Sequence, residues 1–355
     1  MSSQASNALL PLGSGQVGVV VLNYNGWQDT LACLEHVCRL VNAPRRVVVC
    51  DNGSQDGSVD KLLEAWAVLA PENGFPALVE HDPREVLPPA GAPLLLLRLQ
   101  GNDGFSAGNN AGLRLLLHDA GCAAFWLLNN DTTPFPMALE ALLHRANVDP
   151  RIGMTGSSMV WYENHSVLQC AAGGSFAPLL GTTRLLAEGR LLEDAWKDCA
   201  TLETQLDFVL GASMLVRREV IENVGLLDDL FFLYYEDVEW CLRAVQQGFR
   251  IAWAPESVVP HREGGASRAS SAGRKAQQPV RSRLVDYLCI RNRFYLLRRY
   301  NPAALPLAFL SLVVVFGRRL QRGQADRCSL LSRAAFDGLL GRMGNPTSFF
   351  ADMGD

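Results

Sequence analysis

Residues 17–26 read Val-Gly-Val-Val-Val-Leu-Asn-Tyr-Asn-Gly, an unbroken apolar run that ends in a polar cluster. A run of β-branched residues without alternation is typical of a strand that is buried on both faces. Asparagine and glycine after such a run favour a turn. This stretch therefore predicts a central strand whose carboxyl end carries polar side chains.

The same pattern recurs along the first 135 residues. Apolar runs at 47–50, 94–99 and 123–128 alternate with helical patterns at 58–70 and 108–120. Alternating strands and helices predict an α/β fold, in which a mostly parallel sheet carries helices on both faces. The Pro- and Gly-rich residues 71–93 are expected to form a loop.

Three polar clusters follow predicted strands, at 23–25, 51–54 and 129–131. In parallel sheets the ligands bind outside the carboxyl ends of the strands. Asp131 in the third cluster could hold a hard divalent cation, and Asp51 in the second could accept hydrogen bonds from a nucleoside. The alternative for both is an ordinary turn, because Asp and Asn commonly end strands by bonding their own backbone.

Glu236 and Asp237 begin a predicted helix directly after the aromatic run 231–235, and Glu239 follows them. The helix dipole explains one or two acids at this position, but it does not explain their aromatic neighbours. Partial burial raises the pKa of a carboxyl group and makes it a better general base. His261 precedes a Gly- and Arg-bearing stretch that could close over phosphates, and its alternative is a structural or exposed histidine.

Composition bounds the function classes. With 48% apolar residues the chain can bury a large core, and it lacks a Gly-Lys-Ser/Thr phosphate loop, which argues against an NTPase. The net charge of −4 hides eleven arginines against two acids between 281 and 333. This basic segment suits an anionic partner such as a lipid surface or a diphosphate, or else it is a solvated helix face. We expect no nucleic-acid partner.

Nine scattered cysteines without a Cys-x-x-Cys pair indicate buried thiols in a reducing compartment. Residues 1–15 read as a flexible leader without the basic start of a signal peptide. The apolar stretch 303–316 is interrupted by Pro306 and is expected to be too short to span a membrane, although it could lie on one. We therefore expect a cytoplasmic protein, with a peripheral position on the inner face of the membrane as an option.

Taken in order, these segments resemble family 2 glycosyltransferases of the GT-A fold, especially the bacterial rhamnosyltransferase-like enzymes of surface polysaccharide assembly. The resemblance covers roughly residues 16–300, and seven motifs in the right order make it specific. Residues 291–292 and 338–344 also look like the tail of rhamnosyltransferase-like members. The motifs are residues 19–26, 50–58, 102–112, 128–132, 211–212, 235–243 and 261–267.

The resemblance implies a leader at 1–15, a GT-A domain at 16–280 and a basic helical C-terminal extension at 281–355. Within the domain, residues 16–135 would bind the donor and residues 136–280 the acceptor. The extension is a candidate for contact with a membrane.

The resemblance also implies a role for each motif residue. Asp237 would be the catalytic base, with Glu236 a weaker candidate, and Mg²⁺ or Mn²⁺ would bind Asp131 and His261. Asn129 stands where the family has its first metal-binding acid, which leaves Asp131 as the main side-chain ligand. The acceptor would lie against Gly211, Ala212 and Trp240. The nucleotide sugar would contact Asn23, Tyr24, Asn25, Asp51, Asn109 and Asn130.

The implied reaction is an inverting transfer from dTDP-rhamnose or a UDP-hexose to a hydroxyl of a saccharide or a polyprenyl-diphosphate-linked acceptor. Residues 262–279 are expected to be mobile and could order over the donor. One rival, a sugar-1-phosphate nucleotidyltransferase, usually has a Gly-rich basic loop where this chain has residues 23–26. The other, a non-catalytic sugar-nucleotide-binding protein, would need neither Asp237 nor His261.

Overall fold

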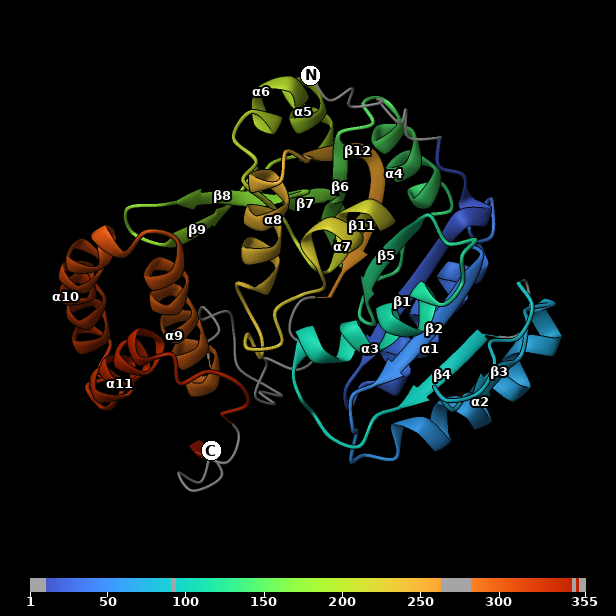
Figure 1. Ribbon diagram of the computed structural model, residues 1–355, viewed down its shortest axis with the longest axis horizontal. Coiled ribbons are helices and arrows are strands. Elements are labelled where there is room, and N and C mark those ends of the chain that lie inside the picture. Colours follow the sequence, from blue (N-terminus) through green and yellow to red (C-terminus); the bar gives the residue numbers. More distant parts are fainter. Residues whose placement is uncertain (1–10, 91–93, 263–281, 347–348, 351–355) are drawn as a thin grey trace, which may run out of the picture.

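The computed structural model describes residues 11–90, 94–262, 282–346 and 349–350. Among these residues, nine strands form one mixed sheet in the order β12-β6-β11-β5-β1-β2-β4-β3, with β7 paired to β6 (Figure 1). The strands are β1 (Val17–Asn23), β2 (Arg46–Asp51), β3 (Leu78–Glu80), β4 (Leu94–Arg98), β5 (Ala124–Asn129), β6 (Ile152–Trp161), β7 (Asn164–Ala171), β11 (Ser213–Arg217) and β12 (Arg250–His261). A small antiparallel sheet joins β8 (Gly173–Ala177), β9 (Thr182–Leu185) and β10 (Phe208–Val209).

The strands formed by residues 17–129 pair in parallel, as the sequence predicts. Strand β1 pairs in parallel with β2 and β5, and β4 pairs in parallel with β2 and β3. Strand β11 is antiparallel to both β5 and β6, which makes the sheet mixed. The α/β fold with a mostly parallel mixed sheet is therefore confirmed.

The sheet is buried on both faces because alternate residues of its central strands point to opposite sides. Val19 and Trp126 belong to one apolar core, which packs under α1, α2 and α4. Val20 and Leu127 belong to the other core, which packs under α3, α7 and α8. These helices are α1 (Trp27–Cys38), α2 (Ser58–Asn73), α3 (Phe105–Leu117), α4 (Ala138–Asn147), α7 (Arg218–Val224) and α8 (Glu236–Gln246). The short α5 (Leu192–Lys197) and α6 (Cys199–Glu203) lie between β9 and β10 in the chain.

Some local predictions are wrong in detail. The expected loop at 71–93 contains β3, and α2 runs on through Pro71 to Asn73. Gly74 then ends α2 in the left-handed conformation that glycine adopts readily. In α8, Val238 is buried, whereas Val245 is exposed because it lies on the outer face of the helix.

The C-terminal extension forms three helices beside the sheet, on the side of α8 (Figure 1). They are α9 (Arg283–Tyr300), α10 (Leu305–Gln321) and α11 (Asp326–Leu340). Part of the arginine excess is used within the extension, since Arg319 and Arg327 both pair with the buried Asp286. Arg291 and Arg293 are themselves buried. The basic composition is therefore only partly available to a partner.

One helix in the described part of the chain, Pro302–Gln321, is long and apolar enough by length and composition to cross a membrane. The expectation that Pro306 shortens this stretch is wrong, because the proline lies in the first turn of α10, where a helix tolerates it. Only 17% of the apolar window is buried. The predicted leader falls largely on residues 1–10, and the predicted closing loop largely on residues 263–279, outside the described residues.

Candidate active site

The predicted polar clusters meet at one edge of the sheet. The register places Asn23 of β1 beside Asp51 of β2, and Leu22 beside Asn129 of β5. Parallel pairing brings the carboxyl ends of these strands together, so residues 28 and 107 positions apart in the chain become neighbours. The edge that the sequence selects as the ligand site therefore gathers the predicted polar clusters.

Asn23 holds this edge together rather than facing a ligand. Its amide donates to Asp51 Oδ2 at 2.7 Å and to Ser54 Oγ at 3.2 Å. Its carbonyl oxygen accepts from Thr30 Oγ1 at 2.8 Å and Asn130 Nδ2 at 3.2 Å. All four hydrogen-bonding positions of the amide are then used, and the residue is only 1% exposed. In this structure Asn23 orients Asp51, and its predicted contact with the nucleotide sugar stays a prediction.

Asp51 and Tyr24 remain the groups that a nucleoside could meet. Asp51 Oδ1 accepts from the backbone of Ser54 at 3.0 Å, which fixes the carboxylate but leaves further lone pairs. The Tyr24 ring is exposed at the same edge. Asn25 adopts a left-handed conformation, with φ of 52°, and its side chain accepts from the backbone of Gln55 at 2.8 Å. The nucleoside-binding roles of these three residues stay predictions.

Two other asparagines serve packing more than binding. Asn109 is buried within α3 and donates to the carbonyl of Phe105 at 2.9 Å, so we assign it to the helix and not to the donor. Asn130 Nδ2 donates to Thr30 Oγ1 at 3.0 Å and lies 3.2 Å from the carbonyl of Gly26. This ties the end of β5 to the start of α1. Only the amide oxygen of Asn130 remains for a ligand.

Asp131 and His261 face each other across the end of the sheet. Asp131 Oδ1 lies 3.2 Å from His261 Nε2, and the other ring nitrogen, Nδ1, lies 2.7 Å from Gln169 Oε1. The Gln169 amide is oriented without ambiguity, because its Nε2 donates to the His261 carbonyl at 2.7 Å and a carbonyl can only accept. His261 Nδ1 must therefore carry a proton, which leaves Nε2 pointing its lone pair at the carboxylate whenever the ring is neutral.

Two lone pairs that converge in this way need a cation between them. Asp131 Oδ1 is buried and has no well-directed hydrogen bond within the described residues. A proton on Nε2 is one solution: burial raises the pKa of Asp131, but an imidazolium beside it has the opposite effect and holds that pKa below its ordinary value. A divalent cation is the other solution, and it turns both groups into ligands.

The residues present thus fit a divalent metal ion. A histidine that donates its second nitrogen to an amide oxygen is typical of metal ligands, because this bond fixes the ring and its tautomer. Within the described ranges no group of three or more His, Cys, Asp or Glu side chains could hold a metal. Two protein ligands suit a hard cation that completes its shell with water and phosphate oxygens.

Asp237 is presented by the first turn of α8. Its Oδ2 accepts from the backbone of Gly211 at 3.2 Å, and its Oδ1 accepts from Val238 N at 2.8 Å. Burial raises the pKa of Asp237 to about 6, although these backbone donors act in the opposite direction. A carboxylate with this pKa is ionised at neutral pH and still basic enough to accept a proton from a hydroxyl.

Glu236 is the second carboxyl group of this turn. It is buried, and its Oε2 has no hydrogen-bond partner in the described structure. Burial and then the charge of Asp237 raise its pKa well above the ordinary value. The Asp237 carboxylate has two backbone donors, so Asp237 is the stronger candidate for the base, as the sequence suggests.

A short path of backbone hydrogen bonds connects the Asp237 carboxylate to the segment that carries Asp131. Gly211 binds Asp237, and the next residue, Ala212, accepts from Asn129 N at 2.9 Å, two residues before Asp131. A Cβ on Gly211 would lie 3.1 Å from the Phe105 ring, so glycine permits this close approach. The predicted contact of Gly211 and Ala212 with an acceptor stays a prediction.

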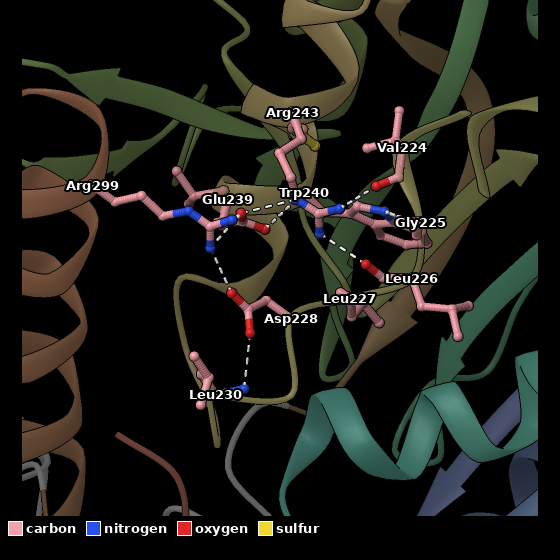
Figure 2. A network of polar contacts seen from close by, with 12 residues as sticks. Val224, Gly225, Leu226, Leu227, Asp228, Leu230, Glu239, Trp240, Arg243 and Arg299 are labelled. Carbon is pink, nitrogen blue, oxygen red and sulfur yellow. Dashed lines mark hydrogen bonds and ion pairs between the residues drawn. The ribbon is translucent and has the colours of Figure 1, made fainter. Parts of the chain in front are cut away.

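Trp240 lies in the core of the protein. Its side chain is 0% exposed, and its indole N–H donates to the Gly225 carbonyl at 2.9 Å (Figure 2). This position does not favour the acceptor contact expected from the sequence, which stays a prediction. Gln169 carries no signal in the sequence, because lateral contacts between β7 and β12 leave no trace in local pattern.

The comparisons with known proteins agree with this geometry. The model of the family described as "Glycosyltransferase like family 2" matches residues 84–280, more than half of the chain. The chain therefore belongs to this glycosyltransferase family.

Among curated proteins, the chain is 33% identical over 107 residues to the dTDP-rhamnosyl transferase RfbF of Shigella flexneri, a match that covers 30% of this chain and 34% of RfbF. It is 26% identical over 280 residues to the N-acetylglucosaminyl-diphospho-decaprenol L-rhamnosyltransferase of Mycobacterium tuberculosis, covering 72% of this chain and 77% of that protein. The chain is thus rhamnosyltransferase-like in sequence. It spans about a third of RfbF and about three quarters of the second relative.

Among solved structures, the mannosyltransferase PcManGT of Pyrobaculum calidifontis, in complex with GDP-Man and Mn²⁺, has a TM-score of 0.51 at 16% identity. That match covers 91% of this chain and 87% of PcManGT. GalNAc-T7 with UDP, GalNAc and Mn²⁺ has a TM-score of 0.50 at 15% identity, covering 69% of this chain and 43% of GalNAc-T7. These likenesses show a shared GT-A-like fold.

Proposed function

We propose that this glycosyltransferase is inverting and metal-dependent, and that it moves a sugar from a nucleoside diphosphate to an acceptor hydroxyl. One observation carries the proposal. The lone pairs of Asp131 and His261 converge at the edge of the sheet, and backbone hydrogen bonds connect the buried carboxylate of Asp237 to the same edge. A cation site and a base tethered in this way suit a donor diphosphate on one side and a nucleophile on the other.

The chemistry follows from the protein groups. Asp237 accepts the proton of the acceptor hydroxyl while that oxygen forms a bond to the anomeric carbon and the bond to the diphosphate breaks. The single displacement inverts the anomeric centre. Asp131 and His261 would hold Mg²⁺ or Mn²⁺, and the metal, when bound, neutralises charge on the departing diphosphate.

The donor is proposed to be dTDP-rhamnose, with a UDP-hexose as the second choice. The names of the two sequence relatives support rhamnose, and the second of them acts on a decaprenol-diphosphate-linked sugar. The acceptor is accordingly proposed to be a saccharide, free or carried on a polyprenyl diphosphate, in surface polysaccharide biosynthesis.

The protein is proposed to work in the cytoplasm, on the inner face of the membrane. Cys50, Cys122 and Cys241 are buried thiols, and burial raises the pKa of each, which suits a reducing compartment. Helix α10 exposes Leu310, Val313 and Val314 on one side. Arg318 and Arg322 are exposed toward its end, so an apolar face lies next to cations that anionic lipids attract.

The test is a donor screen with purified protein, Mg²⁺ or Mn²⁺, and a panel of dTDP-, UDP- and GDP-sugars. The readout is release of nucleoside diphosphate with and without a lipid-linked saccharide. We expect release from one donor, abolished by EDTA, by Asp131→Ala and by Asp237→Asn. Binding of a donor by thermal shift without release under any condition would overturn the proposed catalysis. An unchanged rate in EDTA would overturn only the metal dependence.

A further inference from the structure

The turn that presents Asp237 has an unusual backbone. Tyr234 and Tyr235 both lie in the left-handed region, with φ of 70° and 72°. Bulky residues rarely adopt this conformation, and two in succession must be held there by surrounding structure. Tyr235 is also the N-cap of α8, so the conformation of this pair sets where Glu236 and Asp237 begin.

Asn292 of the C-terminal extension holds this turn. It is completely buried, and its amide nitrogen donates to the carbonyls of Leu233 at 2.9 Å and of Tyr234 at 2.7 Å. Its amide oxygen accepts from Arg291 Nε at 2.9 Å. Since carbonyls can only accept and a guanidinium can only donate, the orientation of the amide is unambiguous. Both of its N–H groups are therefore committed to two consecutive carbonyls of the strained turn.

The same helix contacts α8 a second time, two turns farther along. Tyr300 donates its hydroxyl to Glu239 Oε1 at 2.6 Å. Arg299 Nη1 lies 3.3 Å from the same oxygen and 2.6 Å from Asp228 Oδ2 (Figure 2). Glu239 is fully buried and also binds Arg243 through both of its oxygens. Glu239 thus connects α8 to the end of α9. Residues of α9 therefore contact the chain both before and after Asp237, at the turn 233–234 and at Glu239.

We propose that α9 is a positioning element of the active site, in which Asn292 fixes the left-handed Tyr234–Tyr235 turn and thereby the aim of Asp237. This inference rests on the proposed role of Asp237 as the base. It makes the C-terminal extension part of the catalytic apparatus, although the matched family segment ends at residue 280. Neither Asn292 nor Tyr300 is expected to contact the substrates.

The main test is Asn292→Leu, which keeps a similar volume and removes both donors. The control is Asn301→Leu at the C-terminal cap of the same helix, because Asn301 also donates to a carbonyl, that of Pro178 at 3.0 Å, away from the turn. Steady-state rates are measured with the donor that the screen identifies, at a temperature where thermal melts show each protein folded. We expect kcat to fall at least about tenfold in Asn292→Leu with donor KM within about twofold, because a misplaced base affects the chemical step. Asn301→Leu should keep kcat within about twofold.

A second comparison separates positioning from general packing. Glycine adopts the left-handed conformation freely, so Tyr234→Gly makes the clamp less necessary. In that background, Asn292→Leu should lower kcat by less than about threefold. An equal loss in both backgrounds would mean that Asn292 acts through packing alone and would overturn the proposal.

Folding failure and failure of the base assignment are kept apart. If Asn292→Leu does not fold, Tyr300→Phe removes only one hydroxyl and should still lower kcat about threefold; an unchanged kcat in that variant would overturn the proposal. Asp237→Asn is assayed in parallel. Activity retained in Asp237→Asn would refute the base, whereas an inactive Asp237→Asn beside a fully active Asn292→Leu would refute only the clamp.

Discussion

His261 Nε2 and Asp131 Oδ1 lie 3.2 Å apart, and Gln169 fixes the histidine so that its lone pair faces the carboxylate. The two groups come from β12 and from the segment after β5, which form an isolated bridge between Thr132 and His261. The sheet thus brings together the two groups of the proposed cation site, and the amide of Gln169 on β7 orients one of them.

Gln169→Leu should weaken metal binding without removing a ligand. The lost amide oxygen frees the ring to rotate and to change tautomer. Loss of such a hydrogen bond to a metal-binding histidine costs about 10- to 100-fold in metal affinity or activity. The measurement is the Mn²⁺ concentration that gives half-maximal release of nucleoside diphosphate. We expect this concentration to rise while the rate at saturating Mn²⁺ stays near that of the wild type. An unchanged Mn²⁺ requirement would remove Gln169 from the site.

Asp237→Asn should lower kcat by roughly 10²- to 10⁴-fold, the usual contribution of a general base. In the wild type, kcat/KM should fall as the pH drops through about 6, because the base works only when ionised and burial raises its pKa to about that value. The measurement is a pH–rate profile from pH 5 to pH 8 at saturating metal. A profile without an acidic limb would argue against Asp237.

The same variant should change stability in a pH-dependent way. The folded-state pKa of Asp237 is raised, so its stabilising contribution is present below the unfolded value near 4 and is lost as the pH rises through about 6. Asparagine does not titrate. The free energy of unfolding of Asp237→Asn, relative to the wild type, should therefore be more favourable at pH 8 than at pH 4.5, by about 2 kcal/mol. Equal differences at both pH values would contradict the buried-carboxylate assignment.

Leu310→Glu combined with Val314→Glu should abolish binding to vesicles of anionic phospholipid. Both side chains are exposed on α10, so folding should change by less than about 0.5 kcal/mol per site while the apolar face is lost. The measurement is vesicle co-sedimentation at low salt. Val68→Glu and Val148→Glu are matched controls, since both valines are similarly exposed, one on α2 and the other at the C-terminal cap of α4. Equal binding of all four proteins would remove α10 as the membrane contact.

The fold was largely readable from local pattern. The apolar run at 17–22 predicts β1 because an unalternating run of β-branched residues can be satisfied only by burial on both faces, and both cores are present. The polar residues that end β1, β2 and β5 then fall at one edge by topology alone. The local pattern is less informative for short or mixed elements: β3 is three residues long, and α11 lies in a mixed polar sequence.

The candidate site was only partly readable. The motif order points to Asp51, Asp131, Asp237 and His261, and the structure brings Asp131 to His261 and ties Asp237 to the strand end beside them. The sequence did not show that Asn23 and Trp240 are buried and hydrogen-bonded inside the protein, because the partners of an amide or an indole depend on the tertiary structure. Asn292 was noted only as a family-like residue, and its two bonds to the turn at 233–234 appear only in the tertiary structure.

The sequence by itself determined which residues form the central strands β1, β2, β4 and β5, which polar groups end β1, β2 and β5, and which family the chain resembles, because periodicity and turn chemistry are local properties. Only the tertiary structure decided that burial raises the pKa values of Glu236 and Asp237, that His261 faces Asp131, and that Asn292 of α9 binds the turn before Asp237. Desolvation and hydrogen-bond satisfaction depend on groups far apart in the chain, such as Asn292 and Tyr234, and these meet only after folding.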